Sequence, residues 1–297
     1  MFRRKRFRLR LPSRTLVLGE RTLVMGVLNI TPDSFSDGGI YLDADAAVAR
    51  ALEIERAGAD ILDIGGESTR PGSEGISASE EMRRILPVLE RLRGRLKIPI
   101  SVDTSKAEVA EAAAYQGAEI LNDVTTLRAD PRLAEVAHKR KLPLILMHMR
   151  GEPRTMQKKP FARDVLRDVV SGLRHAVATA RRAGVPKSQI VLDPGIGFGK
   201  SAAQNLELLQ KLPELARLGF ALLVGASRKG FIGKVLGGAA EGERAWGTAG
   251  AVAASILGGA HIVRVHDVAE MSQVARIIDA VLHPESIQVG EGRSGTK

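Results

Sequence analysis

Polar side chains that could bind a ligand follow short apolar runs at eight places along the chain. Carboxylates, amides and guanidinium groups bind planar polar ligands through paired hydrogen bonds, and a carboxylate does so with the added strength of its charge. Any one such residue alone is more often a helix N-cap or a satisfied polar group of the core. Their recurrence at the same place in successive segments favours one common site. They are Asn29, Asp63 with Glu67, Asp103, Asn122 with Asp123, His148, Asp193, Ser227 to Lys229, and Arg264 with His266.

The stretch DPGIGFGK (193–200) has the composition of a nucleotide-binding loop but not its spacing. A dinucleotide fingerprint needs G-x-G-x-x-G, whereas Gly195, Gly197 and Gly199 stand two apart. A Walker-type loop needs four residues between its first glycine and Gly-Lys-Ser, and GIGFGKS has only three. We therefore expect no phosphate cradle here. A flexible turn between a strand and a helix is the plainer alternative.

The elements that must position these residues alternate regularly. Each apolar run is rich in β-branched residues and is followed by an amphipathic or alanine-rich segment, which favours parallel strands covered by helices. Eight such units predict a (β/α)₈ TIM barrel in the α/β class, with its active site at the C-terminal ends of the strands. A doubly wound open sheet is the alternative. The expected strands are 23–30, 61–66, 99–104, 119–124, 143–148, 190–195, 221–227 and 261–266; typical expected helices are 43–58, 105–117, 161–184 and 267–282.

The chain of 297 residues shows no linker that would divide it, so we expect a single barrel domain over residues 14–285. Residues 14–23, RTLVLGERTL, predict a β-hairpin that turns at Gly19-Glu20 and caps the floor of the barrel. Six of the first ten residues are basic, so we expect residues 1–13 to form a basic, disordered arm. Residues 286–297 are expected to be a flexible tail.

Composition limits the possible partners. The chain has no cysteine, which excludes disulfides, thiolate metal sites and a cysteine nucleophile and makes the cytoplasm the expected setting. Aromatic residues make up only 3%, which leaves few stacking surfaces for single-stranded nucleic acid. The net charge of +10 falls to about +4 without the six basic residues of the arm (10 − 6), so no nucleic-acid partner is expected. No run of 18 apolar residues predicts a membrane span.

The motifs at the strand ends together resemble the dihydropteroate synthase family. The resemblance is ordered and runs from about residue 25 to residue 267. It implies a TIM barrel that condenses 6-hydroxymethyl-7,8-dihydropterin diphosphate with 4-aminobenzoate, giving 7,8-dihydropteroate and diphosphate in folate synthesis. It also implies Mg²⁺ dependence, an S_N1-like path, sulfonamides as inhibitors and a homodimer. The motifs are MGVLNITPDSFSDGG (25–39), DIGGESTRPG (63–72), SVDTSK (101–106), LND (121–123), LMHM (146–149), DPGIGFGK (193–200), SRK (227–229) and RVHD (264–267).

The resemblance also implies a role for each matching residue. The pterin would contact Asp103, Asn122, Asp193, Lys229 and Arg264, with the Asp193 carboxylate reading the two donors of the pterin edge. The diphosphate would contact Asn29, Thr69, Arg264 and His266, and Asn29 would be the Mg²⁺ ligand. The 4-aminobenzoate would contact Thr69, Arg70, Pro71, Phe198, Lys229 and Gly230. No general base is assigned.

Two departures and two alternatives accompany the resemblance. Gly230 stands where other members often carry serine or a larger residue, so only its backbone N–H is available. The segments TPDSFSDGG and GGESTRPGSEG correspond to two loops that are mobile in the family. Pterin-binding methyltransferases that use methyltetrahydrofolate share the barrel and the pterin pocket, but they handle no diphosphate. A synthase-like paralogue without activity is the other alternative, because a fold and a pocket alone do not establish catalysis.

Overall fold

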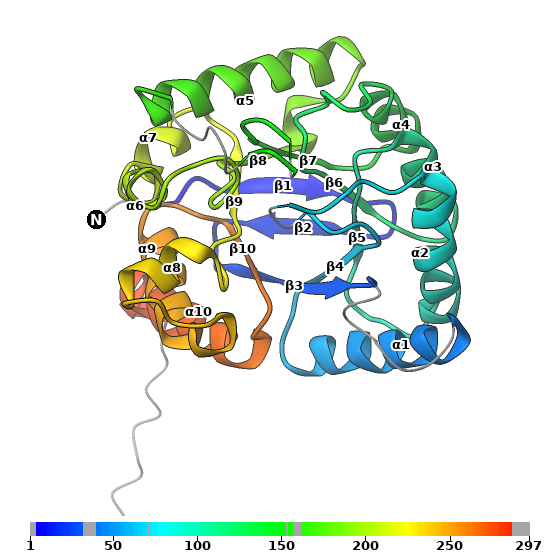
Figure 1. Cartoon of the computed structure of the whole chain (residues 1–297), viewed down its shortest axis with the longest axis horizontal. Helices are drawn as coiled ribbons and strands as arrows, with labels where there is room; N and C mark the ends of the chain where they lie inside the picture. The colour runs from blue at the N-terminus through cyan, green and yellow to red at the C-terminus, as the bar shows by residue number, and fades with distance from the viewer. Residues whose placement is uncertain (1–3, 32–39, 70–71, 153, 157–161, 287–297) are drawn as a thin grey trace, which may run out of the picture.

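The computed structural model describes residues 4–31, 40–69, 72–152, 154–156 and 162–286. Eight parallel strands form a closed barrel in the order β10-β3-β4-β5-β6-β7-β8-β9. The last strand pairs with the first, with Ile262 beside Leu23, and this pairing closes the sheet. Figure 1 shows the helices in a ring around the strands. The predicted (β/α)₈ TIM barrel is therefore confirmed, and the open doubly wound sheet is excluded.

The elements have the following bounds. The barrel strands are β3 (Leu23–Asn29), β4 (Ile61–Gly65), β5 (Ile100–Asp103), β6 (Ile120–Asp123), β7 (Leu144–Met147), β8 (Ile190–Asp193), β9 (Ala221–Val224) and β10 (Ile262–Val265). The helices are α1 (Ile40–Arg56), α2 (Ala78–Leu92), α3 (Ala107–Tyr115), α4 (Leu133–Arg140), α5 (Val165–Arg182), α6 (Ala202–Gln210), α7 (Leu212–Ala216), α8 (Gly230–Val235), α9 (Ala245–Leu257) and α10 (Val268–Leu282). Short 3₁₀ turns cover Lys187–Gln189, Glu241–Glu243 and Pro284–Ser286.

The four helices expected from the sequence are confirmed as α1, α3, α5 and α10. Helix α5 begins at Val165 because the Asp164 side chain caps it, accepting the N–H of Arg167 at 2.9 Å. None of the helices among the described residues is both long and apolar enough to cross a membrane.

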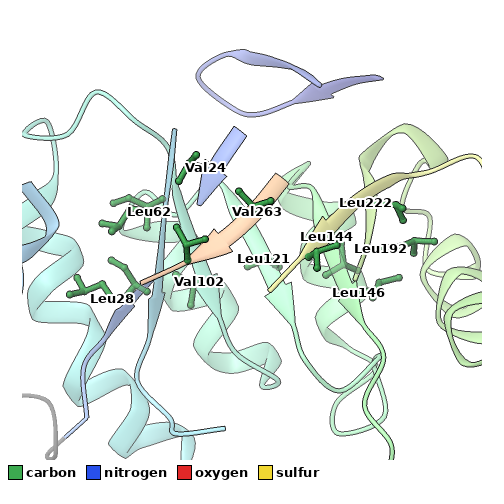
Figure 2. Packing of buried hydrophobic residues seen from close by; sticks show 14 of the residues in the cluster. Val24, Leu28, Leu62, Val102, Leu121, Leu144, Leu146, Leu192, Leu222 and Val263 are labelled. Atoms are coloured by element: carbon green, nitrogen blue, oxygen red, sulfur yellow. The ribbon is translucent and has the colours of Figure 1, made fainter. Parts of the chain in front are cut away.

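Side chains along the barrel strands alternate between two apolar clusters. The outward-pointing residues belong to a large cluster shared with the helices, and Figure 2 shows several of them, including Val24, Leu62 and Val263. Inward-pointing residues near the starts of seven of the eight strands, all except β5, form a second cluster, which we call the barrel-floor cluster. Its strand members are Leu23, Met25, Ile61, Ile120, Ile145, Val191, Ala221, Leu223 and Ile262.

The predicted N-terminal hairpin over this floor is confirmed, but its strands and its turn lie earlier in the chain than predicted. Strand β1 (Phe7–Arg10) pairs with β2 (Thr15–Leu18), so the chain turns before Thr15 and not at Gly19-Glu20. A side chain at Gly19 would meet the backbone oxygen of Lys5 at 2.5 Å, so this glycine packs against the arm while the chain passes on into β3. Leu9, Leu11 and Leu18 insert into the barrel-floor cluster, as a cap on the floor requires.

The expectation of a disordered arm over residues 1–13 was wrong for its described part. Apolar residues alternate with arginines in FRLRL, which is the pattern of a half-buried strand and not only a run of charge. Arg4 is buried and donates from Nη1 to Thr22 Oγ1 (2.6 Å), and its Nη2 pairs with Asp279. The His261 ring lies 2.9 Å from the carbonyl of Lys5 through Nε2. The barrel domain therefore begins in the arm. Residues 1–3, and residues 287–297 of the expected tail, lie outside the described residues.

We predict that the hairpin contributes strongly to stability. Leu9→Ala removes a buried side chain from the floor and should lower the free energy of unfolding by about 2–5 kcal/mol. Arg8→Ala, one residue away but exposed, should change it by less than about 0.5 kcal/mol. Urea unfolding followed by circular dichroism compares the two variants. Equal, small effects would show that the arm does not pack on the barrel.

Candidate functional site

Strand alternation brings predicted site residues from six strands to one end of the barrel. In β4, Ile61 lies in the floor cluster, so Asp63, two residues on, also points inward. The same spacing places an inward polar side chain near the C-terminal end of five other strands. These inward residues are Asn29 of β3, Asp63 of β4, Asp103 of β5, Asn122 of β6, Asp193 of β8 and Arg264 of β10.

Arg264 joins three of these strands through charge-assisted hydrogen bonds. Its Nε donates to Asp63 Oδ2 at 2.7 Å, and its Nη2 donates to Asp103 Oδ2 at 2.9 Å. Asn122 Nδ2 donates to the same oxygen of Asp63 at 3.2 Å. The sequence analysis gave Asp63 no binding role, yet this carboxylate holds both Arg264 and Asn122 in place.

The cluster has more acid than base in a dry environment. Burial raises the pKa of Asp103 to about 8; the Arg264 charge opposes this rise and the Asp63 charge adds to it. One guanidinium faces two buried carboxyl groups, so it neutralises only one of them.

Two acceptor atoms in this cluster have no donor. Asp63 Oδ1 and Asn122 Oδ1 are buried and accept no hydrogen bond from any residue that the structure describes. Buried polar atoms are nearly always satisfied, so unpaired acceptors at a strand end indicate a place for a ligand with donors.

The DPGIGFGK segment forms a tight turn that all three of its glycines are needed to make. Gly195, Gly197 and Gly199 have φ values of 66°, 89° and 64°. A side chain at Gly195 would meet the carbonyl oxygen of His148 at 1.9 Å, and one at Gly199 would meet that of Arg150 at 2.2 Å. The turn therefore packs against the loop that follows β7.

Lys200 ties this turn together from inside. Its ammonium donates to the carbonyls of Gly195 (2.8 Å), Phe198 (3.0 Å) and His148 (3.2 Å). Burial lowers its pKa to about 7. The sequence analysis quoted this lysine within the motif but gave it no role.

Asp193, at the start of the turn, keeps an anionic edge toward the barrel axis. Its Oδ1 accepts the Gly195 N–H at 2.7 Å. Burial raises its pKa to about 6, against the opposing hydrogen bond of Gly195 and the charge of Lys229. The group is therefore mostly ionised at neutral pH.

Two groups from the last two strands complete the site. The Lys229 ammonium lies 3.9 Å from the centre of the Phe198 ring, and burial lowers its pKa to about 8. Burial, followed by the charge of Arg264, lowers the pKa of His266 to about 3, so this imidazole is neutral. The Ser227 hydroxyl lies 3.0 Å from His266 Nδ1 and accepts the His266 backbone N–H.

A cavity of about 610 Å³ opens above these groups. Asp103, Asn122 and Asp193 are buried and are not among the residues that line it. Arg70 and Pro71 lie outside the described residues. A side chain at Gly230 would meet no atom within 4 Å, so the glycine leaves that part of the wall open. The predicted residues that line the cavity are Asn29, Thr69, Phe198, Lys229, Gly230, Arg264 and His266.

Two of the polar residues first grouped with the site point elsewhere. Asp123 accepts the N–H and hydroxyl of Thr125 at 2.8 and 2.7 Å and so holds its own loop. His148 packs on α5, where a side chain at Gly172 would lie 2.6 Å from its ring. Met156, which is not among the residues predicted for the site, packs with Phe198 and lines the cavity.

Asn29 is suited to a single contact with a hard cation. Its Oδ1 lies 3.7 Å from the point that a Gly65 side chain would occupy, so the glycine leaves space beside the amide oxygen. The described residues hold no group of three or more His, Cys, Asp or Glu that could bind a metal by themselves. The residues present therefore fit a cation bound mainly by ligand oxygens and water.

Comparison with known proteins agrees with this geometry. Residues 25–266 match the pterin binding enzyme family. The dihydropteroate synthase of Synechocystis sp. is 50% identical over 263 residues, which are 89% of this chain and 91% of that one. The solved structure of Xanthomonas albilineans dihydropteroate synthase with 4-aminobenzoic acid is 42% identical, covers 94% of this chain and 99% of that one, and has a TM-score of 0.87. The same enzyme in complex with 7,8-dihydropteroate is 41% identical, covers 93% and 98%, and has a TM-score of 0.83. Matches of this identity along almost the whole chain confirm the resemblance of the strand-end motifs: the chain belongs to the dihydropteroate synthase family of pterin-binding enzymes.

Proposed function

We propose that the protein condenses 6-hydroxymethyl-7,8-dihydropterin diphosphate with 4-aminobenzoate to give 7,8-dihydropteroate and diphosphate, in the cytoplasm. The observation that carries the proposal is the pair of unpaired buried acceptors, Asp63 Oδ1 and Asn122 Oδ1, at the end of the barrel to which Asp193 also contributes an anionic edge. A pterin ring offers an amino group and ring N–H groups to such acceptors. A methyltransferase pocket would share this feature, but the family match of the whole chain favours the synthase.

The proposed pterin contacts are one anionic carboxylate and several other polar side chains. Asp193 is the anionic reader of the pterin edge, because its carboxylate is mostly ionised at neutral pH. Asp103, whose pKa is raised by burial and whose Oδ2 accepts a hydrogen bond from Arg264, contacts the ring through its carboxyl group. Asn122 offers both a donor and an acceptor, and Lys229 reaches the ring oxygen and nitrogen. Arg264 contacts the ring face and points donors toward the diphosphate.

The diphosphate occupies the cavity near Asn29, Thr69, Arg264 and His266. His266 contributes a neutral N–H donor and not a cationic charge, because burial lowers its pKa to about 3. Asn29 holds a Mg²⁺ ion through its amide oxygen. When bound, the ion offsets negative charge on the diphosphate oxygens.

The reaction breaks the C–O bond to the diphosphate and forms a C–N bond to the arylamine. An S_N1-like path places positive charge on the pterin methylene and ring, which the Asp193 carboxylate stabilises. Arg264 stabilises the charge on the departing diphosphate. The amine of 4-aminobenzoate attacks as a neutral group and loses its proton afterwards, so the chain needs no covalent nucleophile.

The arylamine occupies the outer part of the cavity. Thr69, Phe198, Lys229 and Gly230 supply its walls. Arg70 and Pro71, which the family resemblance adds to this set, lie outside the described residues. The open space beside Gly230 makes the wall wider here than serine would. Sulfonamides, which copy the shape and acidity of 4-aminobenzoate, bind at the same place.

The proposed homodimer forms through an apolar groove bordered by α6, α8 and α9. Val235 is 61% exposed, and Leu206, Leu236 and Leu257 are each more than 40% exposed around the same groove. An exposed apolar patch of this kind marks an interaction surface. Trp246, at the start of α9, is 90% exposed close by.

Diphosphate release with both substrates tests the activity, and Asp193→Asn tests the site. The amide of the variant points N–H donors at a substrate edge that itself consists of donors. The loss of transition-state stabilisation should be about 2–4 kcal/mol, so kcat/KM should fall roughly 30- to 1000-fold. In the parent enzyme, kcat/KM should fall as the pH drops through about 6, because protonation removes the anionic acceptor. The variant should lack this acid limb. Asp45→Asn, at an exposed position on α1, is the matched control. Equal kcat/KM in Asp193→Asn and the parent would place the pterin elsewhere.

Chelation of Mg²⁺ should stop diphosphate release while the barrel stays folded. The physical reason is that one amide and the substrate oxygens hold the ion, so the fold does not depend on it. Circular dichroism and the melting temperature should match those of the untreated protein, and added Mg²⁺ should restore turnover. Unfolding on chelation would instead identify a structural metal.

Val235→Glu should separate the subunits. The parent is expected to sediment at twice the 31.8 kDa of one chain, and the buried charge should weaken association by about 2 kcal/mol or more, about 30-fold. Tyr115→Glu, which is 72% exposed on α3, is the control and should remain dimeric. A monomeric parent, or an unchanged dimer in Val235→Glu, would contradict this interface.

A further inference from the structure

Two hydrogen bonds join the two sides of the segment that follows β4. The Ile76 N–H donates to Glu67 Oε1 at 3.0 Å, and the Ser73 hydroxyl donates to the carbonyl of Ser68 at 2.6 Å. These bonds join residues that are nine and five positions apart in the chain. We call the place where they hold the two sides of the segment together the neck. Thr69, which lines the cavity, stands two residues after Glu67. The position of Glu67 therefore determines where Thr69 meets the cavity.

Glu67 is itself held by a charged side chain from the next strand's loop. Lys106 Nζ donates to Glu67 Oε2 at 2.7 Å and to Glu81 Oε2 at 2.5 Å. Glu81 belongs to α2 and its side chain is fully buried; burial raises its pKa, and Lys106 opposes that rise. Lys106 therefore connects the neck, helix α2 and the loop after β5, which begins just after Asp103. We call Glu67, Lys106 and Glu81 the neck triad.

The backbone at the root of the segment is fixed to the same helix. A side chain at Gly66 would lie 2.8 Å from Ile85 Cγ2 of α2, so only glycine allows this approach. Arg84, also of α2, donates from Nη1 to the Gly66 carbonyl at 2.9 Å. The root is thus held on α2 by packing and by a hydrogen bond, and Glu67 extends this hold to the far side of the neck.

The arrangement of the triad favours a positioning role over a purely stabilising one. Two carboxyl groups share one ammonium, and one of the carboxyl groups is fully buried. The desolvation penalty of burying such charges is about as large as the free energy gained from their attraction. Apolar side chains would therefore stabilise the fold at least as well. Glu67 also uses its two oxygens for different tasks, one on Lys106 and one across the neck. Fixed geometry is the benefit that the charges supply.

We propose that Glu67, held by Lys106, is a positioning residue for the second substrate: it fixes Ser68 and Thr69 at the cavity wall and so sets the affinity for the arylamine. The inference rests on the proposed function, because it assigns the Thr69 side of the cavity to 4-aminobenzoate. Apart from Asp63 of β4, the proposed pterin contacts lie on other strands, and Asp63 is held by Arg264 and Asn122 and not by the neck, so pterin binding should be largely independent of the neck.

Steady-state kinetics of Glu67→Ala test the proposal. The variant loses both bonds of the carboxylate, so KM for 4-aminobenzoate should rise about tenfold or more, while kcat changes less. The dissociation constant of a pterin that lacks the diphosphate, measured by calorimetry, should stay within about twofold. Glu67→Gln keeps an acceptor for Ile76 but not the charge facing Lys106, so its KM should be intermediate. Arg83→Met removes an exposed ion pair from the same helix and should match the parent.

Hydrogen exchange gives a readout that does not depend on activity. The Ile76 amide should exchange faster in Glu67→Ala than in the parent, because its acceptor is gone. Unchanged exchange and unchanged KM in the folded variant would overturn the proposal, and so would an equal loss of pterin affinity. If the alanine variant does not fold, Glu67→Gln is judged by KM for 4-aminobenzoate and by pterin affinity alone, because it keeps the acceptor for Ile76: an unchanged KM or an equal loss of pterin affinity would overturn the proposal. A parent that releases no diphosphate would refute the proposed function, while the exchange measurement would still test the neck.

Discussion

The alternation of side chains along closed parallel strands is the constraint on which the rest of the site depends. Inward positions near the starts of seven of the eight strands contribute to the barrel-floor cluster, and in six strands the inward position near the C-terminal end contributes to the site. In β4, for example, Ile61 lies in the floor and Asp63 lies in the site. A one-residue slip in register would turn Asp63 toward the helices and break both of its hydrogen bonds. The packing of the floor therefore fixes the chemistry at the opposite end.

The same alternation explains what the sequence could and could not predict. The eight strands, the barrel and the match of strand-end motifs follow from runs of residues that are local in the chain. Asn122 points inward, whereas the adjacent Asp123 holds its own loop. Which of the two points inward depends on whether it is an even number of residues from the inward residue at the strand start; we call this the parity of the position. Strand boundaries set that parity, and a short apolar run leaves them uncertain by a residue or more. The role of Asp63 was missed for the same reason.

Long-range pairing accounts for the other misses. The arginines of the arm were interpreted as a solvated charge run because the partners of Arg4, Thr22 and Asp279, lie 18 and 275 residues away. Lys106 has its partners 39 and 25 residues earlier, so nothing in SVDTSK alone indicates the neck triad. The order of residues in the arm does indicate a strand, because arginine alternates with Phe7, Leu9 and Leu11. The prediction of disorder rested on the charge of the arm and not on the two-residue period of its apolar side chains.

Charge burial at the mouth of the barrel has a cost that the floor must offset. Arg264, Asp103, Asp193 and Lys229 are all largely withdrawn from water, and burial raises the pKa values of the two carboxyl groups and lowers the pKa of Lys229. Burial would lower the pKa of Arg264, but the charges of Asp63 and Asp103 reverse this, so the guanidinium stays ionised. A substrate that carries ring donors and a diphosphate supplies the missing partners: donors for the acceptors of Asp63 and Asn122, and anionic oxygens for Arg264. Groups fixed in this arrangement present their charges to a complementary ligand without rearranging, which is how a preorganised site favours charge separation. The apolar floor, closed by the hairpin, contributes stability to the fold. This stability allows polar atoms at the other end of the barrel to remain without hydrogen-bond partners until the substrate binds.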